Sequence, residues 1–139
     1  MLKLHAERSL PILFTMGFMV HLINLSTYLR NGKLDPGLFM SPMVDAALFA
    51  VMLYSSIALI WEHKVFFKTY GFDKSAGRKI GYWFITYYVT ASIPGHIYYM
   101  YTADSSYFAW FPWWFSPLIM TVYCLMIWFC FSLKPKTQS

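Results

Sequence analysis

Four stretches of the chain are almost uninterrupted runs of apolar residues, with polar residues concentrated between them. The runs cover about residues 11–29, 43–61, 80–101 and 112–133. A helix that crosses a bilayer needs about 20 mostly apolar residues, so each run is long enough for one crossing. The pattern predicts an all-α, integral membrane four-helix bundle, with residues 1–139 forming a single domain.

Turn-forming and polar residues separate the runs. Ser9 followed by Pro11 predicts the start of the first helix, and the Asn-Gly and Asp-Pro-Gly sequences within residues 30–42 predict a turn-rich loop. Residues 62–79 carry five Lys or Arg residues and are predicted to form a longer connection. Pro94 lies inside the third run, where it removes a backbone hydrogen bond and is expected to kink the helix.

The first run carries a stripe of polar and small residues. Gly17, His21, Asn24 and Tyr28 follow one another at spacings of four, three and four, which places them on one face of a helix. The opposite face is purely apolar. An ionisable side chain at this depth is costly unless it faces protein or a wet cavity. The pattern therefore predicts that His21 faces the interior of the bundle.

Composition excludes an ordinary water-facing surface. Of the 139 residues, 58% are hydrophobic and 12% are charged, whereas soluble domains carry about a quarter charged residues. Aromatic residues make up 22% of the chain, and many lie near the ends of the runs, as in an interfacial belt. The first run is too long for a signal peptide and lacks a small-residue cleavage site, so we expect it to remain as an anchor.

The sequence offers little for metal or nucleophilic chemistry. Cys124 and Cys130 lie six residues apart in the fourth run, where they cannot pair comfortably along one helix. The spacings typical of zinc sites, phosphate loops and serine triads are absent from the sequence. We therefore predict neither a metal nor a cofactor.

Basic residues set the predicted orientation. Arg30 and Lys33 lie on one side of a four-span arrangement, and the other nine of the 11 Lys and Arg residues lie on the opposite side. These nine are Lys3, Arg8, Lys64, Lys68, Lys74, Arg78, Lys79, Lys134 and Lys136. The positive-inside rule then predicts that both termini are cytoplasmic. Although the net charge is +5, the basic residues form no continuous patch, and no nucleic-acid partner is expected.

Three ionisable residues converge in the outer half of this arrangement. At 1.5 Å per helical residue, His21 lies about 12 Å from the outer end of its span, His96 about 8 Å and Asp45 about 3 Å. In one interpretation, these groups pair with neighbouring helices and only fix the packing, or Asp45 serves as a first-turn helix charge. In the other, they line a cavity that anchors a mostly apolar ligand. The similar depth of the two histidines also leaves haem ligation open as an alternative, although no second feature favours it.

The runs resemble the helices of the EXPERA superfamily, which includes the emopamil-binding sterol isomerases and the sigma-two receptor. The resemblance is carried by MGFMVHLINL in the first helix and MVDAALFAVMLYSSIALIWEHK in the second, and continues with PGHIYYMYTAD in the third and PWWFSPLIMTVYCLMIW in the fourth. Members typically carry a histidine in the first helix and a carboxylate early in the next one. The resemblance assigns these positions to His21 and Asp45.

One expected carboxylate is missing. The isomerases carry a second acid one turn after the first-helix histidine, where this chain has Asn24 and Leu25. The acid of the sigma-two receptor near the end of that helix is replaced by Tyr28 and Leu29. Moving a double bond in a sterol requires one acid and one base, so the loss weakens the expectation of catalysis but leaves ligand binding intact. Asp45 could pair with a ligand amine, or with protonated His21 when the site is empty.

We therefore expect a protein that binds a sterol-like or other hydrophobic amphipathic ligand, with isomerase activity as an extension. The candidate catalytic residues are His21 and Asp45, and the candidate ligand-binding residues are His21, Asn24, Asp45, His96 and Tyr123. The alternative is a noncatalytic accessory subunit of a larger membrane complex, and a homodimer is also open. The expected location is the endoplasmic reticulum in a eukaryote or the inner membrane in a bacterium.

Overall fold

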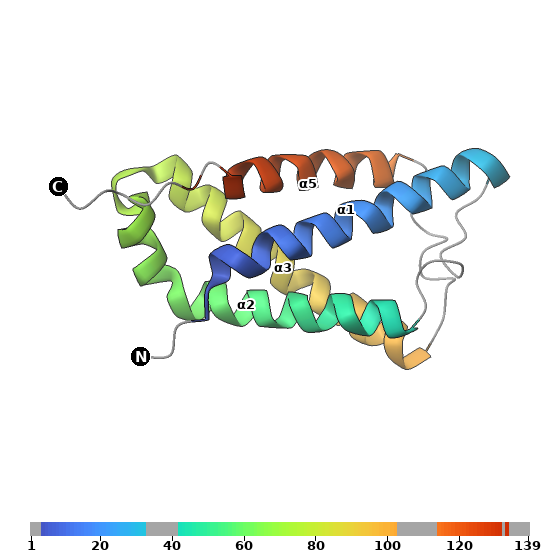
Figure 1. Cartoon of the computed structure of the whole chain (residues 1–139), viewed down its shortest axis with the longest axis horizontal. Coiled ribbons are helices and arrows are strands. Elements are labelled where there is room, and N and C mark those ends of the chain that lie inside the picture. The colour runs from blue at the N-terminus through green and yellow to red at the C-terminus, as the bar shows by residue number, and fades with distance from the viewer. Residues whose placement is uncertain (1–3, 33–41, 103–113, 132, 134–139) are drawn as a thin grey trace.

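The structure is a computed structural model that describes residues 4–32, 42–102, 114–131 and 133. Within these residues all the regular structure is helical, which confirms the predicted all-α class. The elements are α1 (Ala6–Asn31), α2 (Pro42–Tyr70), the short 3-10 helix η2 (Phe72–Lys74), α3 (Ala76–Thr102) and α5 (Phe115–Phe131), as Figure 1 shows.

Helix α1 begins earlier than predicted. Its first residue is Ala6, and Pro11 lies inside the helix rather than at its start. The reason is a contact that local sequence does not reveal, because the carboxylate of Glu62 accepts hydrogen bonds from the backbone at the start of α1. The helix ends at Asn31 and is capped by Gly32, whose φ of 67° is left-handed and whose N–H donates to the Tyr28 carbonyl over 2.8 Å. Glycine adopts this conformation without steric cost.

Helix α2 is longer than the second apolar run. The predicted connection over residues 62–79 is wrong in its first part, because α2 continues to Tyr70 and the turn is confined to residues 71–75. The extension is held by a cluster of aromatic rings. Phe66 is buried and its ring lies 4.6 Å from that of Tyr70, 5.4 Å from Phe72 and 4.9 Å from Tyr82. Lys64 and Lys68, two of the basic residues that suggested a loop, are exposed on this helix.

Helix α3 runs through Pro94 as one continuous element. The predicted kink at that position stays a prediction. The predicted loop over residues 30–42 and the first residues of the fourth run lie largely outside the described residues, and α5 is described from Phe115.

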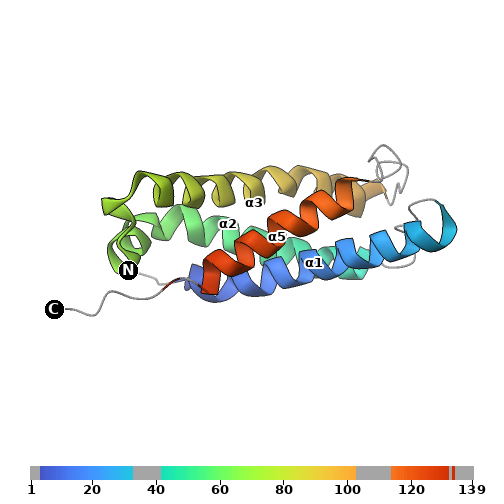
Figure 2. The same cartoon turned by 90° about the horizontal axis from the view of Figure 1, so that it is seen from above.

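The four helices form two pairs. Helix α1 packs most closely along α5, and α2 packs most closely along α3, while a smaller α1–α2 contact joins the two pairs. We call these pairs the α1/α5 layer and the α2/α3 layer. In Figure 1, α1 and α2 lie close together near the start of α1 and diverge toward its other end. Figure 2 shows α5 crossing the α1 helix obliquely.

The core fills the space between the layers with apolar and aromatic side chains. Leu10, Phe14, Leu59, Phe72 and Tyr82 are essentially inaccessible to solvent. Between its charged ends, α1 also carries exposed apolar side chains, namely Ile12, Met19, Leu22 and Leu29. Apolar side chains therefore lie both in the core and on the exterior of this helix.

Two helices, α1 and the Met43–Tyr70 part of α2, are long and apolar enough to cross a membrane. Only 17% of the residues in the most apolar part of α1, and 39% of those in the most apolar part of α2, are buried in the protein. Helix α5 is a shorter apolar helix. The weak burial distinguishes α1 in particular from the core helix of a soluble protein, which is mostly buried.

Candidate functional site

Asp45 and His96 form a buried pair between α2 and α3. The Nδ1–H of His96 donates to Oδ1 of Asp45 over 2.6 Å. The Asp45 side chain is completely buried and that of His96 is 19% exposed. Asp45 lies in the first turn of α2, where the helix N-terminus favours a negative charge. Two residues predicted from the sequence therefore meet, in a position that the protein encloses.

The second carboxylate oxygen of Asp45 has no hydrogen-bond partner among the described residues. Such an atom costs about 1–3 kcal/mol when it is buried and unpaired. Oδ1 of Asn24, another predicted residue, is likewise buried without a partner. Both atoms are hydrogen-bond acceptors. The site thus presents two buried acceptors, one in each layer, to whatever donor can reach them.

His21 contacts α5 rather than Asp45. Its Nδ1 lies 3.4 Å from the hydroxyl oxygen of Ser116, and its ring centre lies 5.8 Å from the ring centres of both Phe115 and Tyr123. The pairing of Asp45 with His21 that we considered for an empty site is replaced by the Asp45–His96 pair.

Tyr123 is buried at the centre of the α1/α5 layer. Its hydroxyl accepts a hydrogen bond from the hydroxyl of Tyr88 over 3.3 Å, and its ring lies 6.0 Å from that of Phe14. A methyl group on Gly17 would come within 2.6 Å of the Tyr123 hydroxyl oxygen. Gly17 therefore makes room for Tyr123, and the polar stripe predicted on α1 does face the bundle at this point.

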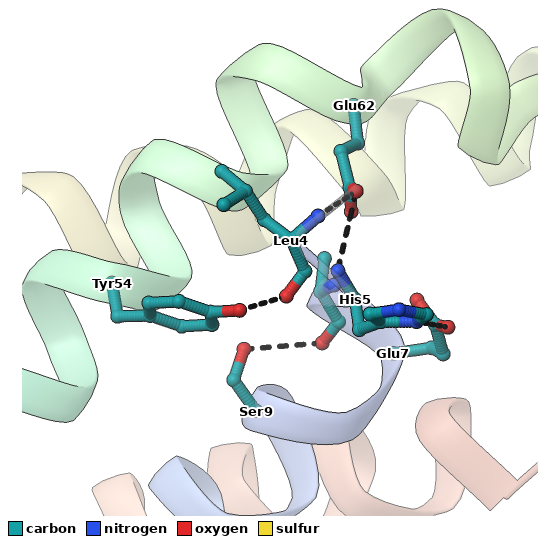
Figure 3. Close-up of polar contacts among 7 residues, drawn as sticks. Leu4, His5, Glu7, Ser9, Tyr54 and Glu62 are labelled. Atoms are coloured by element: carbon teal, nitrogen blue, oxygen red, sulfur yellow. Dashed lines mark hydrogen bonds and ion pairs between the residues drawn. The ribbon is translucent and has the colours of Figure 1, made fainter. Parts of the chain in front are cut away.

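Sequence analysis missed a second polar cluster, which lies at the opposite end of α1 and α2. Glu62 is only 4% exposed, and its carboxylate accepts hydrogen bonds from the backbone N–H groups of Leu4, His5 and Ala6. The hydroxyl of Tyr54 donates to the Leu4 carbonyl. Figure 3 shows that these groups from α2 converge on the first turn of α1.

The signal for this cluster was weak in the sequence because Glu62 directly follows an apolar run and precedes two further polar residues. His5 has a left-handed backbone with a φ of 58°, a conformation uncommon for residues other than glycine. This bend turns successive N–H groups toward one carboxylate. No local sequence motif predicts the bend.

A pocket of about 330 Å³ lies along the C-terminal half of α1, on the bundle exterior. It is lined by Leu22, Leu25, Ser26, Leu29 and Arg30. It does not include the Asp45–His96 pair. The cavity predicted around His21 and Asp45 therefore stays a prediction.

The described residues contain no group of three or more His, Cys, Asp or Glu side chains that could hold a metal ion. Cys124 and Cys130 are both free thiols, with Cys124 on the exposed side of α5. The chemistry available at the site is therefore that of a carboxylate, two imidazoles and several hydroxyls.

Comparison with protein-family models, curated proteins and solved structures gives no match. The resemblance to the EXPERA superfamily rests on the residues quoted above.

Proposed function

We propose that this chain is an EXPERA-like integral membrane protein that binds a sterol-like or other hydrophobic amphipathic ligand at the buried Asp45–His96 pair. The observation that carries the proposal is the completely buried Asp45 carboxylate, which is paired through one oxygen and unpaired through the other. A buried carboxylate in a membrane-spanning segment is costly. Its placement is best explained by a ligand that uses it.

The apolar exterior supports a membrane location. Leu29, Trp128 and Phe131 are each at least 70% exposed, on two different helices. Extensive exposed apolar surface is rare on soluble monomers. The proposed orientation places both termini in the cytoplasm and the Asp45–His96 pair in the outer half of the bilayer. The membrane would be the endoplasmic reticulum in a eukaryote or the inner membrane in a bacterium.

The chemistry of the site defines the polar end of the ligand. Among the described residues, neither the Oδ2 atom of Asp45 nor the Oδ1 atom of Asn24 has a donor, so the proposed ligand would have to donate. A hydroxyl or a protonated amine meets this requirement. The remainder of the ligand would lie among apolar side chains, as is typical of small-molecule sites.

Isomerisation of a double bond is an extension of this proposal. It would require one group to protonate a carbon and another to remove a proton. His21 and Asp45 are the candidates, and His96 would hold the Asp45 carboxylate in place. The absence of a second acid near His21 makes binding the primary proposal.

The alternative is an accessory subunit of a larger membrane complex, or a homodimer. The same exposed apolar faces of α1 and α5 could contact another protein instead of lipid. In that case the Asp45–His96 pair would serve only to join α2 to α3.

Binding can be tested with the purified protein in phosphatidylcholine nanodiscs that contain cholesterol as the probe. We expect wild-type protein to retain cholesterol at near one molecule per chain in native mass spectrometry, and Asp45→Asn to lose most of it. Asp73→Asn is the matched control, because Asp73 is an exposed acid in η2 at the other end of the bundle. Equal retention by all three proteins would refute the assignment to Asp45, and copurification with larger subunits and no bound lipid would favour the accessory role.

A further inference from the structure

We propose that the pocket on the outside of α1 is a phospholipid-binding site, in which Arg30 binds the phosphate group and the leucines of the pocket contact one acyl chain. This inference goes beyond the proposed function, because it concerns the exterior of the bundle and a different class of lipid. It rests on the membrane location and needs neither the Asp45–His96 pair nor the ligand proposed for that pair.

The pocket follows one side of α1. It has a volume of about 330 Å³, and its lining residues are Leu22, Leu25, Ser26, Leu29 and Arg30. Their successive spacings of three, one, three and one keep them on one face of a helix, over about 12 Å along its axis. Pockets that hold small molecules have volumes on the order of 300–1,000 Å³. The pocket is therefore large enough for part of a lipid molecule.

The pocket combines a cationic end with an apolar wall. Arg30 is exposed and lies in the last turn of α1. Leu22 and Leu25, which are farthest from it along the helix together with the neighbouring Ser26, contribute only hydrocarbon side chains. Leu22 is 40% exposed and Leu29 is 75% exposed. A ligand that covers this face must therefore carry both an anionic group and a hydrocarbon segment.

The position of Arg30 matches that of a lipid headgroup. The first apolar run ends at Leu29, so Arg30 is the first charged residue beyond the membrane-spanning segment. Half of the hydrocarbon core of a bilayer is about 15 Å thick, and Leu22 lies about 12 Å from Arg30 along the helix. The leucines therefore cover most of the depth that an acyl chain of the same leaflet occupies.

The polar atoms of the pocket suit the polar part of a phospholipid. The planar guanidinium group of Arg30 can donate two parallel hydrogen bonds to phosphate oxygens. Ser26 lies about 6 Å deeper along the helix, and its hydroxyl can donate to an ester oxygen that joins an acyl chain to glycerol. The two side chains thus match the order of polar groups along the lipid, with the phosphate outermost.

A phospholipid with a net negative charge fits this pocket best. The headgroup of phosphatidylcholine carries an ammonium group, which competes with Arg30 for the phosphate. The headgroup of phosphatidylglycerol carries no cation, so that its phosphate is free to bind the guanidinium group. We therefore expect phosphatidylglycerol to occupy the pocket in preference to phosphatidylcholine.

The site can be located by photocrosslinking. The purified full chain is placed in phosphatidylcholine nanodiscs that contain a small fraction of phosphatidylglycerol with a diazirine in the middle of one acyl chain. After irradiation, the crosslinked residues are identified by peptide mass spectrometry. We expect the crosslinks on α1 to be concentrated within residues 22–29. Unlabelled phosphatidylglycerol should displace the probe at lower concentration than unlabelled phosphatidylcholine does.

Two variants with matched controls test the two parts of the pocket. Arg30→Gln should reduce crosslinking within residues 22–29 about tenfold, the effect expected from losing hydrogen bonds to a charged group. Arg8→Gln removes an exposed arginine near the other end of α1 and should leave this crosslinking unchanged. Ser26→Phe should fill the pocket and also reduce crosslinking, whereas Cys124→Phe, on the exposed side of α5, should not. If Ser26→Phe fails to fold, Ser26→Leu should give a smaller reduction.

Two results would overturn the proposal. Crosslinks spread evenly along α1, or crosslinking that Arg30→Gln leaves unchanged, would mean that the pocket does not select this lipid. A reduction by Arg30→Gln without any reduction by the Ser26 variants would show that the phosphate binds but that no acyl chain enters the pocket. Cholesterol retention is measured separately, so the failure of either proposal leaves the other standing.

Discussion

The phenol ring of Tyr123 lies directly against the backbone of Gly17, so that α1 and α5 approach each other more closely here than a larger residue would allow. A Cβ atom on Gly17 would fall 2.5 Å from Cζ of Tyr123, well inside van der Waals contact. The contact places Tyr123 between His21 and Tyr88. It therefore sets the spacing of the α1/α5 layer at the depth of the candidate site.

Gly17→Ala should reduce the free energy of unfolding by about 1–3 kcal/mol, because the added methyl group forces Tyr123 out of its position. Gly77→Ala and Gly81→Ala are matched controls, since a Cβ atom at either position meets nothing within 4 Å. These controls should be neutral or stabilising by up to about 1 kcal/mol through helix propensity. Reversible unfolding in mixed micelles measures all three, and a Gly17→Ala protein as stable as the controls would contradict the close contact.

His96→Ala should be more destabilising than Asp45→Asn. Removing the histidine leaves a buried carboxylate without its partner, which typically costs about 3–5 kcal/mol, whereas asparagine at position 45 is neutral. The double variant should accordingly be more stable than His96→Ala alone. The same unfolding assay applies, and purely additive losses would mean that the two side chains do not interact.

The helical class and the inward position of the α1 stripe could be predicted because they depend on runs and spacings that are local in the sequence. Counting helical residues from the predicted ends of the spans also predicted that Asp45 and His96 lie in the same half of the bundle. In the structure they form a pair. The choice of His96 over His21 as the partner of Asp45 depends on which helices share a layer. The pairing depends on how the helices pack and cannot be inferred from any single apolar run.

The contact of Glu62 with the start of α1 could not be predicted for a related reason. A glutamate at the end of an apolar run is typical of a solvated helix end, and only the approach of a backbone from 56 residues away makes it a buried acceptor. The continuation of α2 to Tyr70 could not be predicted for the same reason, because one of the rings that contact Phe66 is that of Tyr82, which belongs to α3. In both cases long-range contacts override a correct local pattern.

Glu62→Ala should destabilise the protein and free the start of α1. Loss of the carboxylate leaves backbone donors without partners, at a cost of about 1–3 kcal/mol. Hydrogen exchange at Leu4, His5 and Ala6 should then become faster, while exchange near the Asp45–His96 pair should change little. Glu7→Ala serves as the control. Unchanged exchange at the start of α1 would show that the three bonds do not restrain it.

The proposed orientation makes a prediction about access from the two sides of the membrane. In a background without Cys124 and Cys130, a single cysteine at Asp73 should react with a membrane-impermeant maleimide only from the cytoplasmic side, and one at Arg30 only from the opposite side. Both positions are exposed, so burial in the protein cannot mask them. The expectation follows from the excess of Lys and Arg around Asp73, because such residues remain on the cytoplasmic side during insertion. Labelling of both cysteines from the same side would mean that α2, the helix between them, does not cross the bilayer, and the proposed four-span topology would have to be abandoned.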